Sequence, residues 1–248
     1  MIQLLTVSNR GYLNLLVNFY NTLKVAAPHR LSQLVIITYD QELIKLVPPD
    51  IVGCVRYVSY PSLIIKDETS KQAGYTLEGR PVVSDAIPFG KGYWNLITRY
   101  KLLAIWKLLQ EPNVDAVFYC DPDIAFVRDP FEGLTSGAEF QIQRGNPYCS
   151  GVMYISNSNA AAKQLFNPLA WSDSKLNDEE YLTQQIQAQK VPTHVLDFDT
   201  FPNGLIWDDE AKVQRLIETK RCVLFHFNFI KTAERKLEKM KELKLFFP

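Results

Sequence analysis

Short apolar segments alternate with amphipathic ones over residues 2–60, and this order restricts the chain to few folds. Residues 2–8, 33–40 and 53–60 are apolar runs containing β-branched residues, which is typical of strands. Residues 12–27 and 41–47 lie between them, carry apolar residues at helical spacing and end before prolines. Near-continuous apolar strands are typical of parallel sheets that helices cover on both faces. The sequence therefore predicts an α/β fold with a mainly parallel mixed central sheet flanked by helices.

The remainder of the chain continues this pattern after one interruption. Residues 61–91 are polar and show no sustained period, which indicates either a loop over a site or a disordered segment. The further helices are predicted at 93–110, 158–166, 177–189, 209–220 and 231–244, and the further strands at 114–120, 137–143, 151–156, 193–198 and 221–227. The sequence contains no repeat, low-complexity tract or linker, so we expect a single domain spanning residues 1–248.

Charge and cysteine usage narrow the class of protein. Lysine plus arginine and aspartate plus glutamate both total 27, a balance unlike that of nucleic-acid-binding proteins. The four cysteines lie far apart in apolar surroundings without a CxxC spacing, which indicates core thiols rather than a zinc site. The N-terminus lacks the basic region of a signal peptide, and no apolar run reaches the length of a membrane span. We expect a cytoplasmic protein with no transmembrane segment, no nucleic-acid partner and a small-molecule or protein-surface ligand.

Two aspartates directly follow the apolar run at 114–120. Asp121 and Asp123 flank Pro122 in the segment YCDPDIAFVRDP, and Asp-Pro is by itself an ordinary turn signal. On an extended segment, side chains two residues apart point the same way, so both carboxylates would face one spot and repel each other. Such a pair is a poor acid–base couple, whereas a cation such as Mg²⁺, Mn²⁺ or Ca²⁺ relieves the repulsion. The two aspartates lie beyond the end of a predicted strand, which is where ligands bind in open α/β sheets.

Five further segments accompany YCDPDIAFVRDP, in one order over nearly the whole chain: TVSNRGYLNLLVNFYNTLK, ITRYKLLAIWKLL, YCSGVMYISNSN, WSDSKLNDEEYLTQQI and HFNFIK. Together they resemble the GT-A type glycosyltransferases of the nucleotide-diphospho-sugar transferase family, with YCDPDIAFVRDP matching the DxD motif. The resemblance implies one Rossmann-like domain that binds a nucleoside-diphosphate sugar and Mn²⁺ or Mg²⁺. It also implies transfer of the sugar to a hydroxyl of a glycan or glycoconjugate. Residues 1–123 would form the nucleotide-binding half, and residues 124–248 the acceptor and catalytic half.

The resemblance further implies a set of metal ligands. Asp121 would contact the ribose or the metal, and Asp123 would bind the metal directly. His226 would be the third ligand, arriving late in the chain. A lone histidine at the end of an apolar strand is more often structural, so this assignment depends on the resemblance.

Other polar residues are candidates for contacts with the sugar nucleotide. Lys101 or Arg99, on the helix before the DxD motif, would pair with Asp121 or with a phosphate. Lys231 would reach the diphosphate, although a solvated charge is an equal alternative in this lysine-rich part of the chain. The remaining candidates for donor binding are Thr6, Ser8, Asn9, Tyr39, Ser150 and Gly151.

The acidic residues at 178–180 depart from the family pattern. Asp178 and Glu179 stand where relatives carry Asp-Gln, and Thr183 stands where asparagine is usual. An inverting enzyme needs a carboxylate base for the acceptor hydroxyl, and a retaining one needs a group beneath the anomeric carbon. Asp178 is the first candidate for either role and Glu179 the second, although acidic residues are also favoured in the first turn of a helix. The family resemblance favours retention.

Two other functions share these features. A nucleotidyltransferase or sugar-nucleotide hydrolase also uses paired carboxylates on such a sheet, but it would normally carry a glycine-rich phosphate loop, and TVSNRGY is not one. A non-catalytic sugar-nucleotide-binding protein would retain the fold with a degenerate site. Metal-dependent release of free nucleoside diphosphate separates an enzyme from a binding protein.

Overall fold

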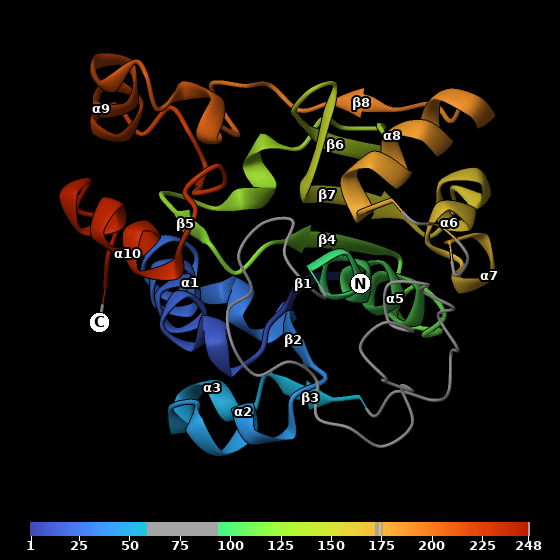
Figure 1. Cartoon of the computed structure of the whole chain (residues 1–248), viewed down its shortest axis with the longest axis horizontal. Helices are drawn as coiled ribbons and strands as arrows, with labels where there is room; N and C mark the ends of the chain where they lie inside the picture. Colours follow the sequence, from blue (N-terminus) through green and yellow to red (C-terminus); the bar gives the residue numbers. More distant parts are fainter. Residues whose placement is uncertain (59–93, 172–173, 175, 248) are drawn as a thin grey trace, which may run out of the picture.

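A mixed sheet of strands from both ends of the chain forms the centre of the molecule (Figure 1). The computed structural model describes residues 1–58, 94–171, 174 and 176–247, with the side chains of residues 94–97 left out. Over these residues the sheet order is β3-β2-β1-β4-β7-β6-β8, and only the pairings of β7 with β4 and β6 are antiparallel. The strands are β1 (Ile2–Val7), β2 (Leu34–Thr38), β3 (Val55–Tyr57), β4 (Ala116–Cys120), β6 (Phe140–Arg144), β7 (Tyr148–Ser156) and β8 (His194–Val195). The predicted mainly parallel mixed sheet is confirmed.

Helices cover both faces of this sheet, as the apolar strands require. Leu4 of β1 packs in the cluster that includes the α1 helix, whereas its neighbour Leu5 packs with α5, because successive side chains of a strand point to opposite faces. In Figure 1, α1 and α5 lie on opposite sides of the strands. The helices are α1 (Leu13–Ala26), α2 (Gln41–Leu46), α3 (Pro49–Val52), α5 (Trp94–Leu108), α6 (Ala160–Phe166), α7 (Pro168–Trp171), α8 (Asp178–Gln189), α9 (Glu210–Glu218) and α10 (Ala233–Glu242).

A second, two-stranded sheet brings the late part of the chain beside the end of β4. Strand β5 (Ile124–Phe126) pairs antiparallel with β9 (Leu224–His226), and Ile124 stands opposite His226. The sequence predicted a strand at 221–227 but not its partner β5, because β5 has only three residues and directly follows the DPD segment. This pairing fixes where His226 lies relative to the two aspartates.

The C-terminal segment is anchored on α1 by a buried amide. Asn18 is fully buried, donates to the carbonyl of Leu245 at 3.1 Å and accepts from the amide of Phe247 at 2.7 Å. These contacts hold α10 against α1, where Figure 1 shows it. Helix α10 therefore has a defined position next to the end of β5.

Some element boundaries differ from the sequence expectations. The strand predicted at 53–60 begins only at Val55, because Pro49–Val52 forms a helical turn, and the strand predicted at 193–198 is the two-residue β8. All four cysteines are free thiols; Cys120, Cys149 and Cys222 are buried, as expected of core thiols, whereas Cys54 is half-buried. In the described part of the chain no helix has the length and apolar character that a membrane span needs. The irregular segment 61–91 lies outside the described residues.

Candidate active site

Asp121 and Asp123 converge on one spot, but through a turn rather than an extended segment. Residues 122 and 123 form the turn between β4 and β5. The Asp121 amide donates to the Gly151 carbonyl at 2.8 Å, and the Asp123 carbonyl accepts from the Phe227 amide at 2.9 Å. These two backbone bonds tie the turn to β7 and to the end of β9. The extended geometry expected from the sequence was wrong, yet the tied turn produces the expected convergence.

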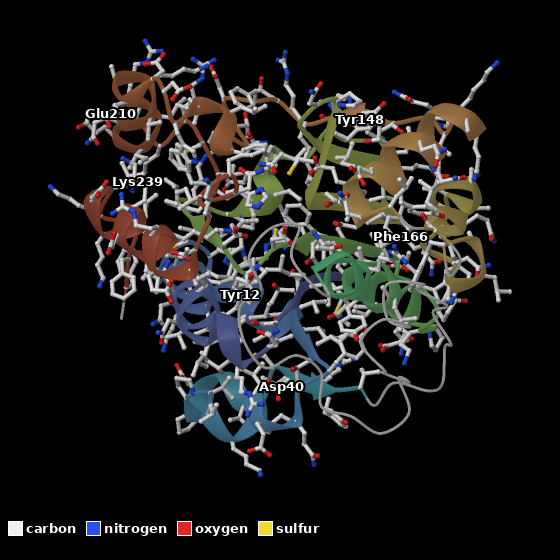
Figure 2. The ribbon with its side chains drawn as sticks, viewed as in Figure 1. Tyr12, Asp40, Tyr148, Phe166, Glu210 and Lys239 are labelled. Carbon is white, nitrogen blue, oxygen red and sulfur yellow. The ribbon has the colours of Figure 1, made fainter. Side chains whose placement is uncertain are left out.

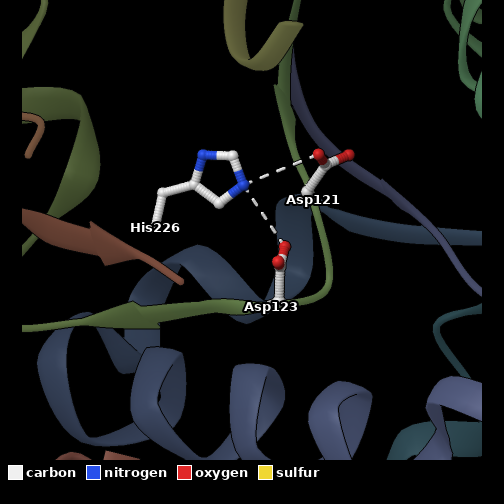
Figure 3. A group of neighbouring side chains, drawn as sticks. All are labelled: Asp121, Asp123 and His226. Carbon is white, nitrogen blue, oxygen red and sulfur yellow. Dashed lines mark ion pairs between the residues drawn. The ribbon is translucent and has the colours of Figure 1, made fainter. Parts of the chain in front are cut away.

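His226 joins the two aspartates, as Figure 3 shows. Its Nε2 lies 3.4 Å from Asp123 Oδ1 and 3.7 Å from Asp121 Oδ2. One ligand atom from each of the three residues lies within 4.8 Å of the others, and His226 is 2% exposed. Two carboxylates and an imidazole at this spacing are a set of donor atoms that can hold a divalent cation.

Gly151 stands directly beneath the His226 ring. A β-carbon at this position would lie 2.0 Å from His226 Cε1, so no larger residue fits without displacing the imidazole. The sequence assigned Gly151 to donor binding, and what the structure reveals is this close approach to His226.

Lys236 of α10 reaches the same site from the C-terminal helix. Its ammonium forms an ion pair with Asp123. Burial alone would raise the pKa of the Asp123 carboxyl, but the charges and hydrogen bonds of Lys236 and His226 outweigh it and hold that pKa well below its usual range. The sequence did not single out Lys236, because one lysine among many in a charged helix carries no local signal. Lys231, which was singled out, is exposed.

Lys101 of α5 links the DxD segment to the start of α8. Its Nζ lies 2.9 Å from Asp121 Oδ1 and 2.9 Å from Asp178 Oδ2. It is also 3.3 Å from Ser150 Oγ, and this hydroxyl donates to Asp178. Burial would lower the pKa of the Lys101 ammonium, but the Asp121 and Asp178 carboxylates outweigh it and keep that pKa above its usual range. Of the two basic residues considered on this helix, Lys101 forms the expected pair with Asp121, and Arg99 donates to the Leu176 carbonyl.

Two tyrosines that the sequence did not single out adjoin the aspartates. The Tyr119 hydroxyl donates to Asp121 Oδ1 at 2.6 Å, and this hydrogen bond orients the Asp121 carboxylate. Burial and then the charges of Asp123 and Asp121 raise the pKa of Tyr12 to about 12. Figure 2 shows Tyr12 at the start of α1. Neither tyrosine has a sequence signal that separates it from the other aromatic residues of the core.

Asp178 and Glu179 occupy the first turn of α8, which a capping box with Asn177 and Glu180 begins. Asp178 is 2% exposed and bound by Lys101 and Ser150. Glu179 is half-buried; burial first, and then the charge of Asp178, raise the pKa of its carboxyl. Of the two carboxyls, that of Glu179 is the less enclosed.

The polar residues at the ends of β1 and β2 lie at the same edge of the sheet as the aspartates. Thr6 is fully buried, and its hydroxyl has no hydrogen-bond partner among the described residues. Ser8 and Asn9 are also buried just beyond β1. Tyr39 packs on Tyr100 and donates to its carbonyl at 3.3 Å, so its hydroxyl is already engaged.

Three tryptophans that could stack on a sugar have different surroundings. Trp171 is completely buried in the main core, and Trp94 has no described side chain. Trp207 is stacked on Phe225 and lines a cavity of about 450 Å³ between α9 and α10, away from the aspartates. Figure 2 shows Glu210 and Lys239 on these two helices. The distance from Lys239 Nζ to Glu210 Oε1 is 3.8 Å.

Comparisons with known proteins identify the family and the fold. A family model described as nucleotide-diphospho-sugar transferase matches residues 29–240. The galactosyltransferase LgtC in complex with donor and acceptor sugar analogues is 13% identical, with 100% of this chain and 98% of that chain covered and a TM-score of 0.52. A glycosyltransferase involved in the glycosylation of the major capsid of PBCV-1 is 10% identical, with 97% and 98% covered and a TM-score of 0.53. A search of curated proteins finds no match.

Proposed function

The chain belongs to the nucleotide-diphospho-sugar transferase family and has the GT-A fold, and from this premise we propose a metal-dependent, retaining transfer of a sugar to a glycan or glycoconjugate hydroxyl. Its activity as a nucleotide-sugar glycosyltransferase follows from the family. The cation, the stereochemistry and the acceptor are the proposed part. The observation that carries the proposal is the convergence of Asp121, Asp123 and His226, whose ligand atoms lie within 4.8 Å of one another.

The chemistry of these three side chains fits Mn²⁺ or Mg²⁺. Carboxylate oxygens suit both ions, which typically take one or two carboxylates together with the phosphates of a substrate. An imidazole nitrogen favours Mn²⁺ of the two, because Mg²⁺ strongly prefers oxygen ligands. The ion pair between Asp123 and the Lys236 ammonium indicates that the site attracts positive charge.

A cation held there would neutralise the negative charge that develops on the departing diphosphate, which is a Lewis-acid role. The protein's own residues prepare the site for this charge. Lys101 offsets the charges of Asp121 and Asp178, and Tyr119 donates to Asp121, so that the carboxylates keep one orientation without the ligand. Preorganised groups of this kind need little reorganisation during the reaction.

The donor nucleotide would lie across the ends of β1, β2 and β4, in the half formed by residues 1–123. The unpartnered hydroxyl of buried Thr6 supports this placement, because a buried polar atom normally has a partner. The other proposed donor contacts come from both halves: Ser8, Asn9, Tyr39, Lys101, Asp121, Ser150, Gly151 and Lys231. The half formed by residues 124–248 would bind the acceptor.

We assign Glu179 as the carboxylate that acts at the anomeric carbon of the donor sugar. Asp178 instead holds the Lys101 ammonium beside Glu179. A carboxyl that Lys101 and Ser150 both bind has little freedom to attack, whereas Glu179 is half-buried and less constrained. In a retaining reaction Glu179 attacks the anomeric carbon as the bond to the diphosphate oxygen breaks, and the acceptor hydroxyl then displaces Glu179 and loses its proton to the diphosphate. Alternatively, the Glu179 carboxylate stays unbonded and stabilises an oxocarbenium-like state.

The test begins with a thermal-shift screen of nucleoside-diphosphate sugars with and without Mn²⁺, since a ligand that binds the native state stabilises it. The donor that gives the largest shift is then incubated with glycan acceptors, and the nucleoside diphosphate and the glycosylated product are measured. We expect both products only with a divalent cation, and NMR of the new linkage should show the anomeric configuration of the donor. Equal turnover in EDTA would overturn the metal dependence, and an inverted product would overturn retention. Release of free sugar with every acceptor would instead support a hydrolase.

A further inference from the structure

Gln143 contacts the ring nitrogen of His226 that is remote from the two aspartates. Gln143 Oε1 lies 2.8 Å from His226 Nδ1, whereas Nε2 faces Asp121 and Asp123 (Figure 3). Gln143 is 0% exposed and His226 is 2% exposed, so water does not compete for this contact. The two ring nitrogens therefore have separate partners, an amide on one side and the carboxylates on the other.

Two backbone carbonyls determine the orientation of the Gln143 side-chain amide. Its Nε2 donates to the carbonyl of Phe201 at 3.0 Å and to that of Pro202 at 3.3 Å. Carbonyl oxygens only accept hydrogen bonds, so they select the NH₂ group and exclude Oε1 from that side. A flipped amide would place three oxygens together in a buried site and leave the NH₂ protons facing the imidazole. The oxygen of Gln143 therefore faces His226.

From these contacts we infer that Gln143 is a positioning residue that fixes the tautomer and the ring plane of His226. Because Oε1 can only accept, Nδ1 must carry a proton, and Nε2 is the nitrogen that faces Asp121 and Asp123 and can offer its lone pair to a cation. That lone pair is what a metal ion requires from histidine, and a hydrogen bond to the other nitrogen commonly sets it. The inference rests on the proposed cation site and identifies a residue that prepares it.

The surrounding backbone holds Gln143 and His226 in this relation. The pairing of β6 with β7 shifts register between Ile142 and Gln143, and such a bulge redirects the side chain that follows it. The Pro202 carbonyl accepts from the His226 amide at 3.1 Å as well as from Gln143, so one peptide group ties both residues. The Cys149 sulfur lies 3.7 Å from Nδ1, and thiols are weak partners, so the Gln143 oxygen is the determining contact.

The first test measures Mn²⁺ binding, by electron paramagnetic resonance of the free ion, to the wild-type protein and to Gln143→Met. Methionine has a similar length but offers Nδ1 no oxygen acceptor. We expect Mn²⁺ affinity to fall about 10–100-fold, the usual effect of losing an outer-shell partner of a ligating histidine. Gln141→Met is the matched control, because Gln141 lies on the same strand, is 1% exposed and bonds Thr135 and Ala138 rather than His226. A similar affinity in wild type and Gln143→Met, or an equal loss in Gln141→Met, would overturn the proposal.

The second test determines the tautomer of His226 directly in the wild-type protein, so it does not depend on whether a variant folds. Long-range ¹H–¹⁵N NMR distinguishes protonated from unprotonated ring nitrogens, and the chain has only 3 histidines to assign. In metal-free protein, under conditions where His226 is neutral, we expect protonated Nδ1 and unprotonated Nε2. The opposite tautomer, or a mixture, would overturn the role of Gln143. Because this spectrum contains no metal, it tests the inference even in a protein that proves not to bind Mn²⁺.

Discussion

Lys101 and Asp178, from helices α5 and α8, form a buried ion pair of 2.9 Å. The same ammonium lies 2.9 Å from Asp121, so one cation serves two carboxylates that are remote in sequence. Lys101→Met would leave both carboxylates without their buried cation. Removing one partner of a buried pair costs about 3–5 kcal/mol, and we expect that loss in the free energy of unfolding measured with urea. Lys45→Met, which removes an exposed pair with Glu42, should leave the free energy of unfolding close to the wild-type value, and equal effects of the two substitutions would contradict the structure.

Asp123→Asn keeps the size of the side chain but removes a charge from the candidate cation site. We expect loss of Mn²⁺ binding and of metal-dependent sugar transfer, because an amide replaces a carboxylate ligand. Isothermal titration with Mn²⁺ and an assay of nucleoside-diphosphate release measure the two effects. Asp129→Asn is the control, since Asp129 is also buried beside a proline but pairs with Arg30. Full activity of the Asp123 variant would exclude the proposed cation site.

Lys236→Met should bind Mn²⁺ more tightly than the wild-type protein. The Lys236 ammonium pairs with Asp123, so an incoming cation must compete with it for that carboxylate. Titration with Mn²⁺ alone measures this change, which we expect to be severalfold. Lys239→Met, one turn further along α10, removes pairs with Glu242 and Glu210 and should leave the affinity unchanged. Weaker binding in Lys236→Met would show that Lys236 supports the site rather than competing for it.

Gly151→Ala should disturb His226. The new methyl group would lie 2.0 Å from the ring, and relieving such overpacking typically costs about 1–3 kcal/mol. We expect a lower melting temperature and weaker Mn²⁺ binding, because the imidazole must move from the carboxylates. Gly53→Ala is the matched control, because its new methyl group would meet no atom within 4 Å. Wild-type Mn²⁺ affinity in the Gly151→Ala variant would contradict the close packing.

Glu179→Gln should change how stability depends on pH. Burial and the charge of Asp178 raise the pKa of Glu179 above its ordinary value of 4.5, so the folded state holds this proton more tightly than the unfolded state. The wild-type protein should therefore lose stability relative to Glu179→Gln as pH rises from about 4.5 through the raised pKa, and the difference should vanish below that window. Urea unfolding at a series of pH values measures it. Glu180→Gln, which changes an exposed neighbour and keeps a capping acceptor, should retain the wild-type pH dependence. An unchanged pH dependence in Glu179→Gln would contradict the burial of this carboxyl.

The order of apolar segments was enough to predict the central sheet and most helices. Leu4 and Leu5 illustrate why, because they pack on opposite faces of β1 and burial of both faces makes the strand almost continuously apolar. The helix predicted at 177–189 likewise matches α8, whose first turn is determined locally by a capping box formed within four consecutive residues. Strand β5 was missed, because a three-residue strand carries too little periodicity to be recognised.

The sequence by itself determined the fold class, the position of Asp121 and Asp123 after β4, and the candidacy of His226, because these depend on local pattern and motif order. Only the tertiary structure decided which distant side chains meet there. Lys236 reaches Asp123 because Asn18 anchors the C-terminal segment on α1, and Gln143 reaches His226 because a bulge redirects it. Neither residue has a local signal, since a lysine in a charged helix and a glutamine in a strand resemble many others. Such contacts arise from packing between remote segments, whose geometry the linear pattern does not encode.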